Sequence, residues 1–204
     1  VVGILPDVHL AIKPDFHRPG QAIVLLRASE PGDATDAETE FGSSEYAKEV
    51  LGSIWGFPPS LELEREAALQ KALMVLAAAG LLDSAHDCSE GGIAVTLVEC
   101  GFANSIGMSV DLQSSGLAPE FLLFGEDASR VVVSCDHGNL NGIKEVAGKY
   151  GISAALVGAT TAERVEIKLD GQTLVSASIS GLRDSYEPAL EAALKADAEL
   201  VTMS

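Results

Sequence analysis

Basic residues are scarce in this chain of 204 residues, which has 13 lysines and arginines against 30 aspartates and glutamates and a formal net charge of −17. A surface of that charge repels phosphodiester backbones and anionic lipid, so we expect neither nucleic acid nor a membrane as a partner. A small phosphate-bearing ligand is compatible with this charge if backbone N–H groups, a metal ion or basic residues of another chain bind it.

Cysteines and long apolar runs are also few. Cys88, Cys100 and Cys135 are odd in number, lie far apart and form no CxxC or Cys/His pattern. That spacing argues against a disulfide framework or structural zinc and favours the reducing cytoplasm. No apolar run reaches the roughly 18 residues of a membrane-spanning helix. Since neither a P-loop nor a GxGxxG motif is present, the chain does not predict a self-contained nucleotide site.

Apolar residues make up 47% of the chain and glycine contributes 20 residues, which is enough for one large domain with close contacts between its elements. The predicted last two strands are joined by the hairpin turn Asp170-Gly171. That pattern favours an α+β fold with a mixed sheet flanked by helices over a doubly wound parallel sheet. Strands are predicted over 21–28, 81–85, 108–112, 129–135, 154–160, 164–169 and 173–179, and helices over 45–56, 57–80, 91–102, 139–150 and 182–194.

Several boundaries rest on local signals. Ser43 or Ser44 is predicted to cap the first helix, and Gly52 or Gly56 to end it. Ser60 is predicted to cap the long helix that Gly80 stops. Its predicted buried stripe consists of Leu69, Leu73, Leu76 and Ala77. The acidic stretch 29–40 is predicted to be an exposed loop, residues 1–5 a buried strand, and the tail after Leu194 frayed.

The stretch "SAHDCSEGG" concentrates site-like residues between a predicted strand and a helix. Ser89 lies near the expected N-cap, and Gly91 and Gly92 would let a ligand or another backbone approach unpaired N–H groups. Asp87 is suited to hold a metal, accept from a ligand hydroxyl or cap the helix. The structural alternative is a tight corner that needs small residues for packing.

Cys88 allows a sharper hypothesis, because a thiol near a helix N-terminus can have a lowered pKa and His86 could act as its base. Catalytic pairs usually meet across the fold, however, and these two are sequence neighbours. No oxyanion hole or orienting carboxylate is evident. We therefore expect no cysteine nucleophile.

Two further stretches have ordinary and functional interpretations. In "FGEDASR", Glu126 and Asp127 could bind Mg²⁺. A solvated turn before a strand is the favoured explanation, because the two side chains would point different ways on an extended chain. In "FGSSEY", helix capping explains the hydroxyls. Trp55 is expected in the core or an interface. The remaining histidines are expected at the surface; they are His9, His17 and His137.

Taken in order, "FGSSEYAKEVLG", "SAHDCSEGGIAVTLVE" and "FLLFGEDASRVVVS" resemble the C-terminal part of the phosphoribosylformylglycinamidine synthase II family, also called formylglycinamide ribonucleotide amidotransferase. The His-Asp-x-Ser-Glu/Asp-Gly-Gly pattern alone indicates only the wider superfamily that includes aminoimidazole ribonucleotide synthetase and selenophosphate synthetase. The resemblance implies the C-terminal fold of those proteins for residues 21–196. It also implies that residues 1–20 end a preceding ATP-binding-type domain, and that residues 197–204 form a tail.

The resemblance implies an ATP- and Mg²⁺-dependent ligase of purine biosynthesis. ATP would phosphorylate the amide oxygen of formylglycinamide ribonucleotide, and glutamine-derived ammonia would displace the phosphate. A glutaminase subunit, a small accessory subunit and the upstream domains are the implied partners. The family's catalytic His, metal carboxylates and Gly-Asn-x-Ser loop have no counterpart in this sequence, so it predicts no catalytic or metal-binding residue.

Candidate residues for a substrate or nucleotide cleft are His86, Asp87, Ser89, Gly91, Gly92, Glu126 and Asp127. The family's Glu-Ser-Gln, which touches substrate in the first half of the duplicated protein, is Glu126-Asp127-Ala128 here. We therefore expect this copy to support the core at an inter-domain cleft and to be inactive alone. Two alternatives are the matching domain of another superfamily member and a non-catalytic docking module for a glutaminase.

Overall fold

The computed structural model of the protein describes residues 7–28, 34–114 and 116–202. The predicted strand over 1–5 lies outside these residues. Two short 3₁₀ helices, Val8–Leu10 and His137–Asn139, accompany the regular elements.

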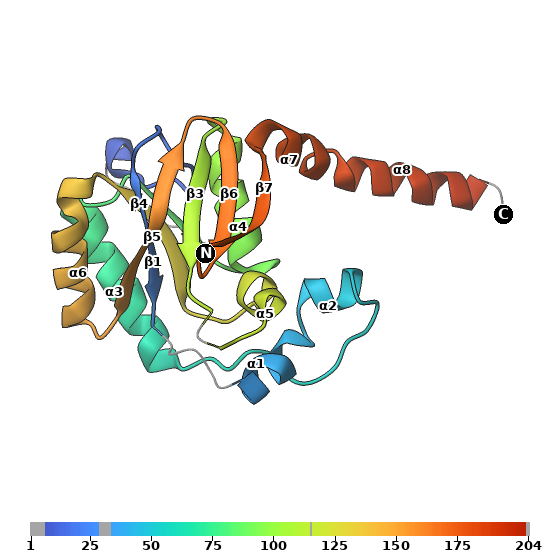
Figure 1. The fold of residues 1–204 in the computed structure, drawn as a ribbon, viewed down its shortest axis with the longest axis horizontal. Helices are drawn as coiled ribbons and strands as arrows, with labels where there is room; N and C mark the ends of the chain where they lie inside the picture. Colours follow the sequence, from blue (N-terminus) through green and yellow to red (C-terminus); the bar gives the residue numbers. More distant parts are fainter. Residues whose placement is uncertain (1–6, 29–33, 115, 203–204) are drawn as a thin grey trace.

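The described residues form one seven-stranded sheet with the order β2-β4-β1-β5-β3-β6-β7 (Figure 1). Neighbouring strands are antiparallel except β3 and β6, which are parallel. This mixed sheet with its flanking helices confirms the predicted α+β class. The strands are β1 (Ala22–Arg27), β2 (Ser84–Asp87), β3 (Gly107–Leu112), β4 (Arg130–Cys135), β5 (Ser153–Thr161), β6 (Arg164–Leu169) and β7 (Gln172–Ser178).

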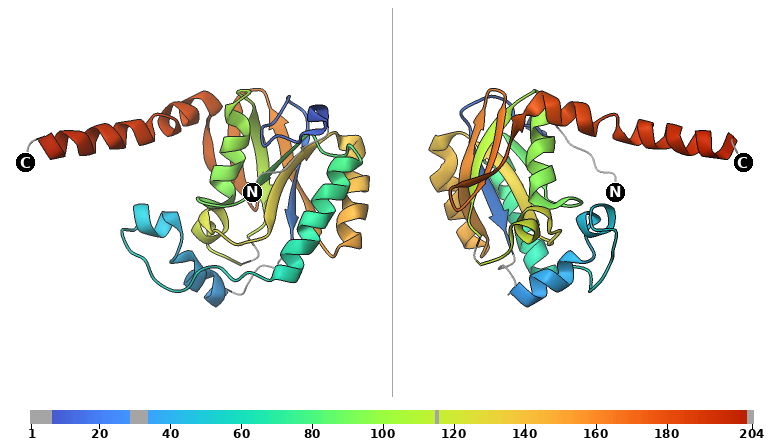
Figure 2. Two further views of the ribbon diagram at one scale, coloured as in Figure 1. Left: turned by 180° about the vertical axis from the view of Figure 1, so that it is seen from behind. Right: turned by 45° about the vertical axis from the view of Figure 1, so that its right-hand side comes forward.

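Helices cover both faces of the sheet because successive side chains of its central strands point to opposite faces. Val24 and Leu26 of β1 pack with α3 (Leu63–Ala78) and α6 (Leu140–Lys149). Ile23 packs on the other face with α4 (Gly92–Phe102). Figure 2 shows α6 and α4 on opposite sides of the sheet.

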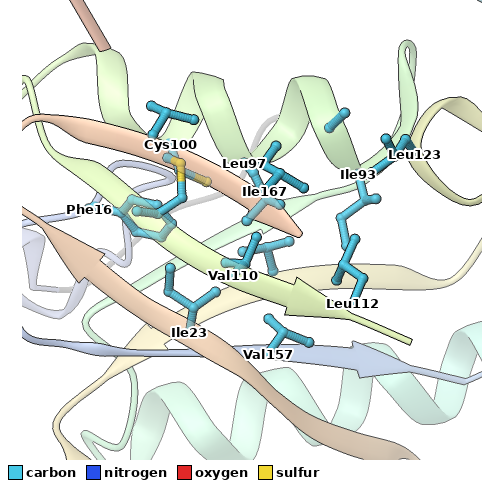
Figure 3. Packing of buried hydrophobic residues seen from close by; sticks show 14 of the residues in the cluster. Phe16, Ile23, Ile93, Leu97, Cys100, Val110, Leu112, Leu123, Val157 and Ile167 are labelled. Atoms are coloured by element: carbon cyan, nitrogen blue, oxygen red, sulfur yellow. The ribbon is translucent and has the colours of Figure 1, made fainter. Parts of the chain in front are cut away.

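The core on the α4 face extends from the segment before β1 to α5 (Pro119–Phe124). Phe16 and Cys100 lie at one end of it, Leu97 lies near the middle, and Ile93, Leu112 and Leu123 lie at the other end (Figure 3). The backbone of Phe16 donates to the Cys100 carbonyl at 2.7 Å. Phe16, which precedes β1, therefore packs into this core.

Helices α1 (Ala34–Phe41) and α2 (Glu45–Glu49) occupy the region where the sequence predicted a loop and a longer helix. The loop prediction for 29–40 is wrong from Ala34 on, because Phe41 at the end of α1 is almost fully buried and anchors this helix to the body. Ser44 caps α2 by accepting from the N–H of Ala47, as predicted. The helix ends before Gly52.

Two other boundaries differ from the predictions, and a third agrees. Helix α3 begins at Leu63 without a side-chain cap, and the N–H of Ser60 donates instead to the Glu40 carboxylate at 3.0 Å. The second strand begins at Ser84, where pairing with β4 starts, and not at Leu81. Gly80, with φ of +64°, ends α3 as predicted.

The predicted last helix is two helices, α7 (Ile179–Tyr186) and α8 (Ala189–Thr202). Pro188 lies between them and has no N–H to continue the first helix. Helix α8 projects from the body and continues through Thr202, where a frayed tail was predicted (Figure 2).

Candidate functional site

Three stretches far apart in the sequence meet at the carboxylate of Glu126. Its Oε1 accepts a hydrogen bond from the N–H of Gly91 at 2.9 Å and another from the N–H of Glu45 at 3.0 Å. Glu126 follows α5, Gly91 precedes α4, and Glu45 begins α2. Acceptance by an ionised carboxylate makes these bonds stronger than neutral ones. The three motifs that carried the family resemblance are therefore one structural unit.

The glycine pair before α4 forms a closely packed corner. Gly91 and Gly92 have φ of 77° and 65°, a region that favours glycine. A Cβ on Gly92 would lie 2.6 Å from the carbonyl oxygen of Gly125 and 2.7 Å from that of Leu123. The N–H of Gly92 donates to the Ser89 carbonyl at 3.0 Å. Because both glycine N–H groups already have acceptors inside the protein, these two groups do not fit a phosphate cradle.

His86, Asp87 and Ser89 precede the glycine corner in the chain. Asp87 and Ser89 are exposed, and neither side chain caps α4, whose N-cap is Gly91. The ring of His86 lies between two carboxylates, with Nδ1 3.5 Å from Asp87 and Nε2 3.6 Å from Glu99. Glu99 also accepts from the hydroxyl of Tyr186. Glu99 of α4 thus contacts both His86 of β2 and Tyr186 of α7.

Asp127 contacts Arg130. Its carboxylate lies 3.6 Å from Nη1 of Arg130, and its carbonyl accepts from the Nε of that arginine at 3.2 Å. Both residues line a cavity of about 200 Å³ that α1 and α5 also bound. The expectation that Glu126 and Asp127 point different ways agrees with these contacts. Among the described residues, no three His, Cys, Asp or Glu side chains are grouped closely enough to hold a metal ion.

Cys88 has the surroundings of a packed thiol. It is 7% exposed, and burial raises the pKa of its thiol above the ordinary value. Its N–H donates to the carbonyl of Arg130, which extends the pairing of β2 and β4 by one residue. A raised pKa disfavours the thiolate that a nucleophile requires.

An aromatic cluster holds the α1–α2 segment against α5. Phe41 lies 4.8 Å from Phe121, and Tyr46 stacks on Phe124 at 4.6 Å, measured between ring centroids. Trp55 contacts Phe41 edge-on, and its Nε1 donates to the Glu38 carbonyl. The tryptophan is 37% exposed, so it borders this cluster instead of filling the core.

Two arginines that the sequence analysis did not single out line cavities beside this site. Arg27 ends β1 and Arg130 begins β4, and the two are direct partners in the sheet. The available sequence signal was a basic residue at the end of two otherwise apolar strands, "QAIVLLR" and "RVVVSC". This sequence signal indicates a site only once the pairing of β1 with β4 is known, because that pairing places the two arginines next to each other.

The mixed sheet, the glycine corner and the two layers of helices define a domain of the synthetase-like α+β class. Residues 18–170 match the family described as AIR synthase related protein, C-terminal domain. The chain belongs to this family. Helix α8 lies beyond the matched range.

The curated relatives are longer proteins. The chain is 33% identical over 190 residues to phosphoribosylformylglycinamidine synthase subunit PurL of Moorella thermoacetica, covering 93% of this chain and 25% of that protein. The chain is 34% identical over 200 residues to the same subunit of Chlorobaculum tepidum, covering 95% of this chain and 25% of that protein. The chain thus spans about a quarter of the length of these relatives.

Solved structures share the fold. PurL of T. maritima complexed with FGAR superimposes with a TM-score of 0.72 at 20% identity, covering 86% of this chain and 30% of that one. A chain of a HypE–HypF complex superimposes with a TM-score of 0.52 at 18% identity, covering 82% of this chain and 54% of that one. Within the described residues, no helix is long and apolar enough to cross a membrane.

Proposed function

We propose that this chain is the C-terminal domain of a phosphoribosylformylglycinamidine synthase synthetase subunit, which converts formylglycinamide ribonucleotide to formylglycinamidine ribonucleotide with ATP, Mg²⁺ and glutamine-derived ammonia. The observation that carries the proposal is the convergence of "FGSSEY", "HDCSEGG" and "FGEDASR" on Glu126. Identity of about a third to two PurL subunits over nearly the whole chain supports it.

The domain's contribution in this proposal is structural. The bonds of Glu126 keep α2, α4 and the 125–130 turn in register, and the occupied N–H groups of Gly91 and Gly92 leave phosphate transfer to upstream parts of the protein. The exposed Asp87 and Ser89 and the half-buried His86 then face the cleft toward those parts. Residues 1–20 would end the preceding domain, and 197–204 would be a tail.

The proposed setting and partners follow from the same assignment. Three buried free cysteines support a reducing compartment such as the cytoplasm. Upstream domains, a glutaminase subunit and a small accessory subunit are the proposed partners, and a T. maritima structure bears the name PurLQS. Exposed apolar side chains between α2 and α3 support a contact surface there, among them Val50, Ile54 and Phe57.

A domain exchange tests the proposal. The matching quarter of the M. thermoacetica PurL is replaced by this chain, and product formation from ATP and ammonia is measured. We expect the hybrid to be active and the isolated chain to be inactive. The control hybrid carries the corresponding HypE domain, which has a similar fold, and should be inactive. A folded hybrid no more active than this control would contradict the proposal.

The docking alternative predicts a different result. A pure docking module would bind the glutaminase as an isolated chain and leave product formation from free ammonia unchanged when it is deleted. Binding measurements with the isolated chain, together with ammonia-dependent activity of the truncated parent, separate the two functions.

A further inference from the structure

A cavity of about 510 Å³ lies between the sheet and the α4–α5 layer, apart from the Glu126 cluster. This volume is in the range of small-molecule sites. Its walls are mainly apolar and include Leu25, Ile93, Leu112, Leu122 and Val157. Ile93 and Leu112 are neighbours at one end of the core (Figure 3).

Two arginines lie in the wall of this cavity. Arg27 and Arg130 are direct cross-strand partners on β1 and β4, so their side chains leave the same face of the sheet. Arg130 is 2% exposed, and its Nη2 donates to the Gly125 carbonyl at 2.5 Å. Together with the contact of its Nε to Asp127, this bond holds one guanidinium in a defined orientation.

The charges around the cavity favour an anion. Of the described residues that line it, Asp111 alone carries a carboxylate, and Asp111 accepts from the N–H of Gly171 at 3.0 Å. Like charges placed directly opposite on paired strands repel. The Asp127 carboxylate, 3.6 Å from Nη1 of Arg130, offsets part of that repulsion, and an anion in the larger cavity would relieve more of it. This convergence of two cations occurs in a chain of net charge −17.

The adjoining smaller cavity shares both arginines but differs in charge. Four carboxylates line it: Asp36, Glu40, Glu62 and Asp127. An anion would therefore meet the arginines from the larger cavity, where its remaining atoms contact apolar side chains.

We propose that the larger cavity binds a small molecule with one carboxylate or phosphate group on an uncharged, mainly apolar body. A guanidinium presents parallel donors that match the oxygens of either group. The apolar walls then select for the body of the molecule. This site is separate from the proposed synthetase role, and its test measures binding directly.

Benzoate, phenyl phosphate, inorganic phosphate and the uncharged benzyl alcohol are suitable probes for the 204-residue chain. Titration is followed by calorimetry and by the NMR signals of the arginine Nε–Hε groups. We expect saturable binding of benzoate or phenyl phosphate, whichever carries the preferred group, with shifts of the Arg27 and Arg130 signals. Benzyl alcohol and inorganic phosphate should bind about tenfold more weakly or worse. No saturation by either aromatic anion up to about 10 mM would overturn the proposal.

Two variants and a control locate the site. Arg27→Gln should weaken binding of the preferred probe about tenfold, because a charged donor is lost. Ala155→Phe should weaken it as strongly without a change of charge, because Ala155 lines the cavity. Arg164→Gln removes an equal charge at an exposed position of β6 and should leave the affinity unchanged. Arg130 is retained because its contacts shape the 125–130 turn. Equal weakening by Arg27→Gln and Arg164→Gln would overturn the proposal, as would unchanged binding in folded Ala155→Phe protein.

Discussion

Oε1 of Glu126 lies 2.9 Å from the backbone nitrogen of Gly91, 35 residues earlier in the chain. The same oxygen accepts from the N–H of Glu45, 81 residues earlier. One side chain thus satisfies a donor at the start of α2 and another before α4. Removing the Glu126 carboxylate would leave these two partly buried N–H groups without a hydrogen-bond acceptor. The free-energy cost of two unsatisfied donors exceeds the net contribution that the two hydrogen bonds make to stability.

Glu126→Ala should lower the free energy of unfolding by about 2–3 kcal/mol, since both charge-assisted bonds disappear. Glu126→Gln keeps an acceptor oxygen and should cost about 1 kcal/mol. Urea unfolding followed by circular dichroism measures both. Glu120→Ala, at an exposed position of α5, is the control and should lie within about 0.5 kcal/mol of the unchanged protein. Equal stability of Glu126→Ala and Glu120→Ala would show that the cluster contributes little.

Gly92→Ala and Gly80→Ala separate backbone strain from steric overlap. The two glycines have nearly the same φ, +65° and +64°, but only Gly92 has backbone atoms in the position of a Cβ. Gly80→Ala should therefore cost about 1 kcal/mol for the left-handed conformation alone. Gly92→Ala should cost about 2–3 kcal/mol more, because α4 must shift from the Gly125 carbonyl. Thermal unfolding of both variants checks this, and equal costs would disprove the close packing.

Tyr186 should ionise at unusually high pH, because its hydroxyl donates to the Glu99 carboxylate and this bond raises its pKa to about 12. Absorbance of tyrosinate against pH, taken as the difference from Tyr186→Phe protein, measures this. Glu99→Gln should lower the pKa, since the charged acceptor is lost. Because the folded-state pKa is raised, the contact stabilises the fold below pH 10.0, the ordinary value, and this contribution is lost as pH rises toward about 12. Titration of Tyr186 near pH 10.0 would contradict the contact.

The cysteines should resist alkylation in the folded protein. Burial raises the pKa of Cys88 and raises that of Cys135 to about 11, so little thiolate forms near neutral pH. Modification by iodoacetamide at about pH 8, followed by mass spectrometry, should be about a hundredfold slower than in urea. Rapid, selective alkylation of Cys88 in folded protein would instead revive its interpretation as a reactive thiol. Cys88→Ser protein serves to identify the modified site.

Local patterns predicted the regular elements well. Alternating or continuous apolar runs predicted β1, β4 and β6, and Asp170-Gly171 predicted the β6–β7 turn, where both residues have positive φ. Turn chemistry and side-chain period act over a few residues, so they can be read from the chain. Helix α1 was missed because its acidic sequence is a weak signal and its burial depends on Phe41 meeting α5.

The sequence by itself determined the α+β class, most strands and the motifs shared with the family, because these depend on neighbours along the chain. Only the tertiary structure decided that Glu126 occupies the N–H groups of Gly91 and Glu45, and that Arg27 and Arg130 line one cavity. Those relationships join residues from separate elements. They depend on strand register and helix packing, which the pattern within any one segment does not specify.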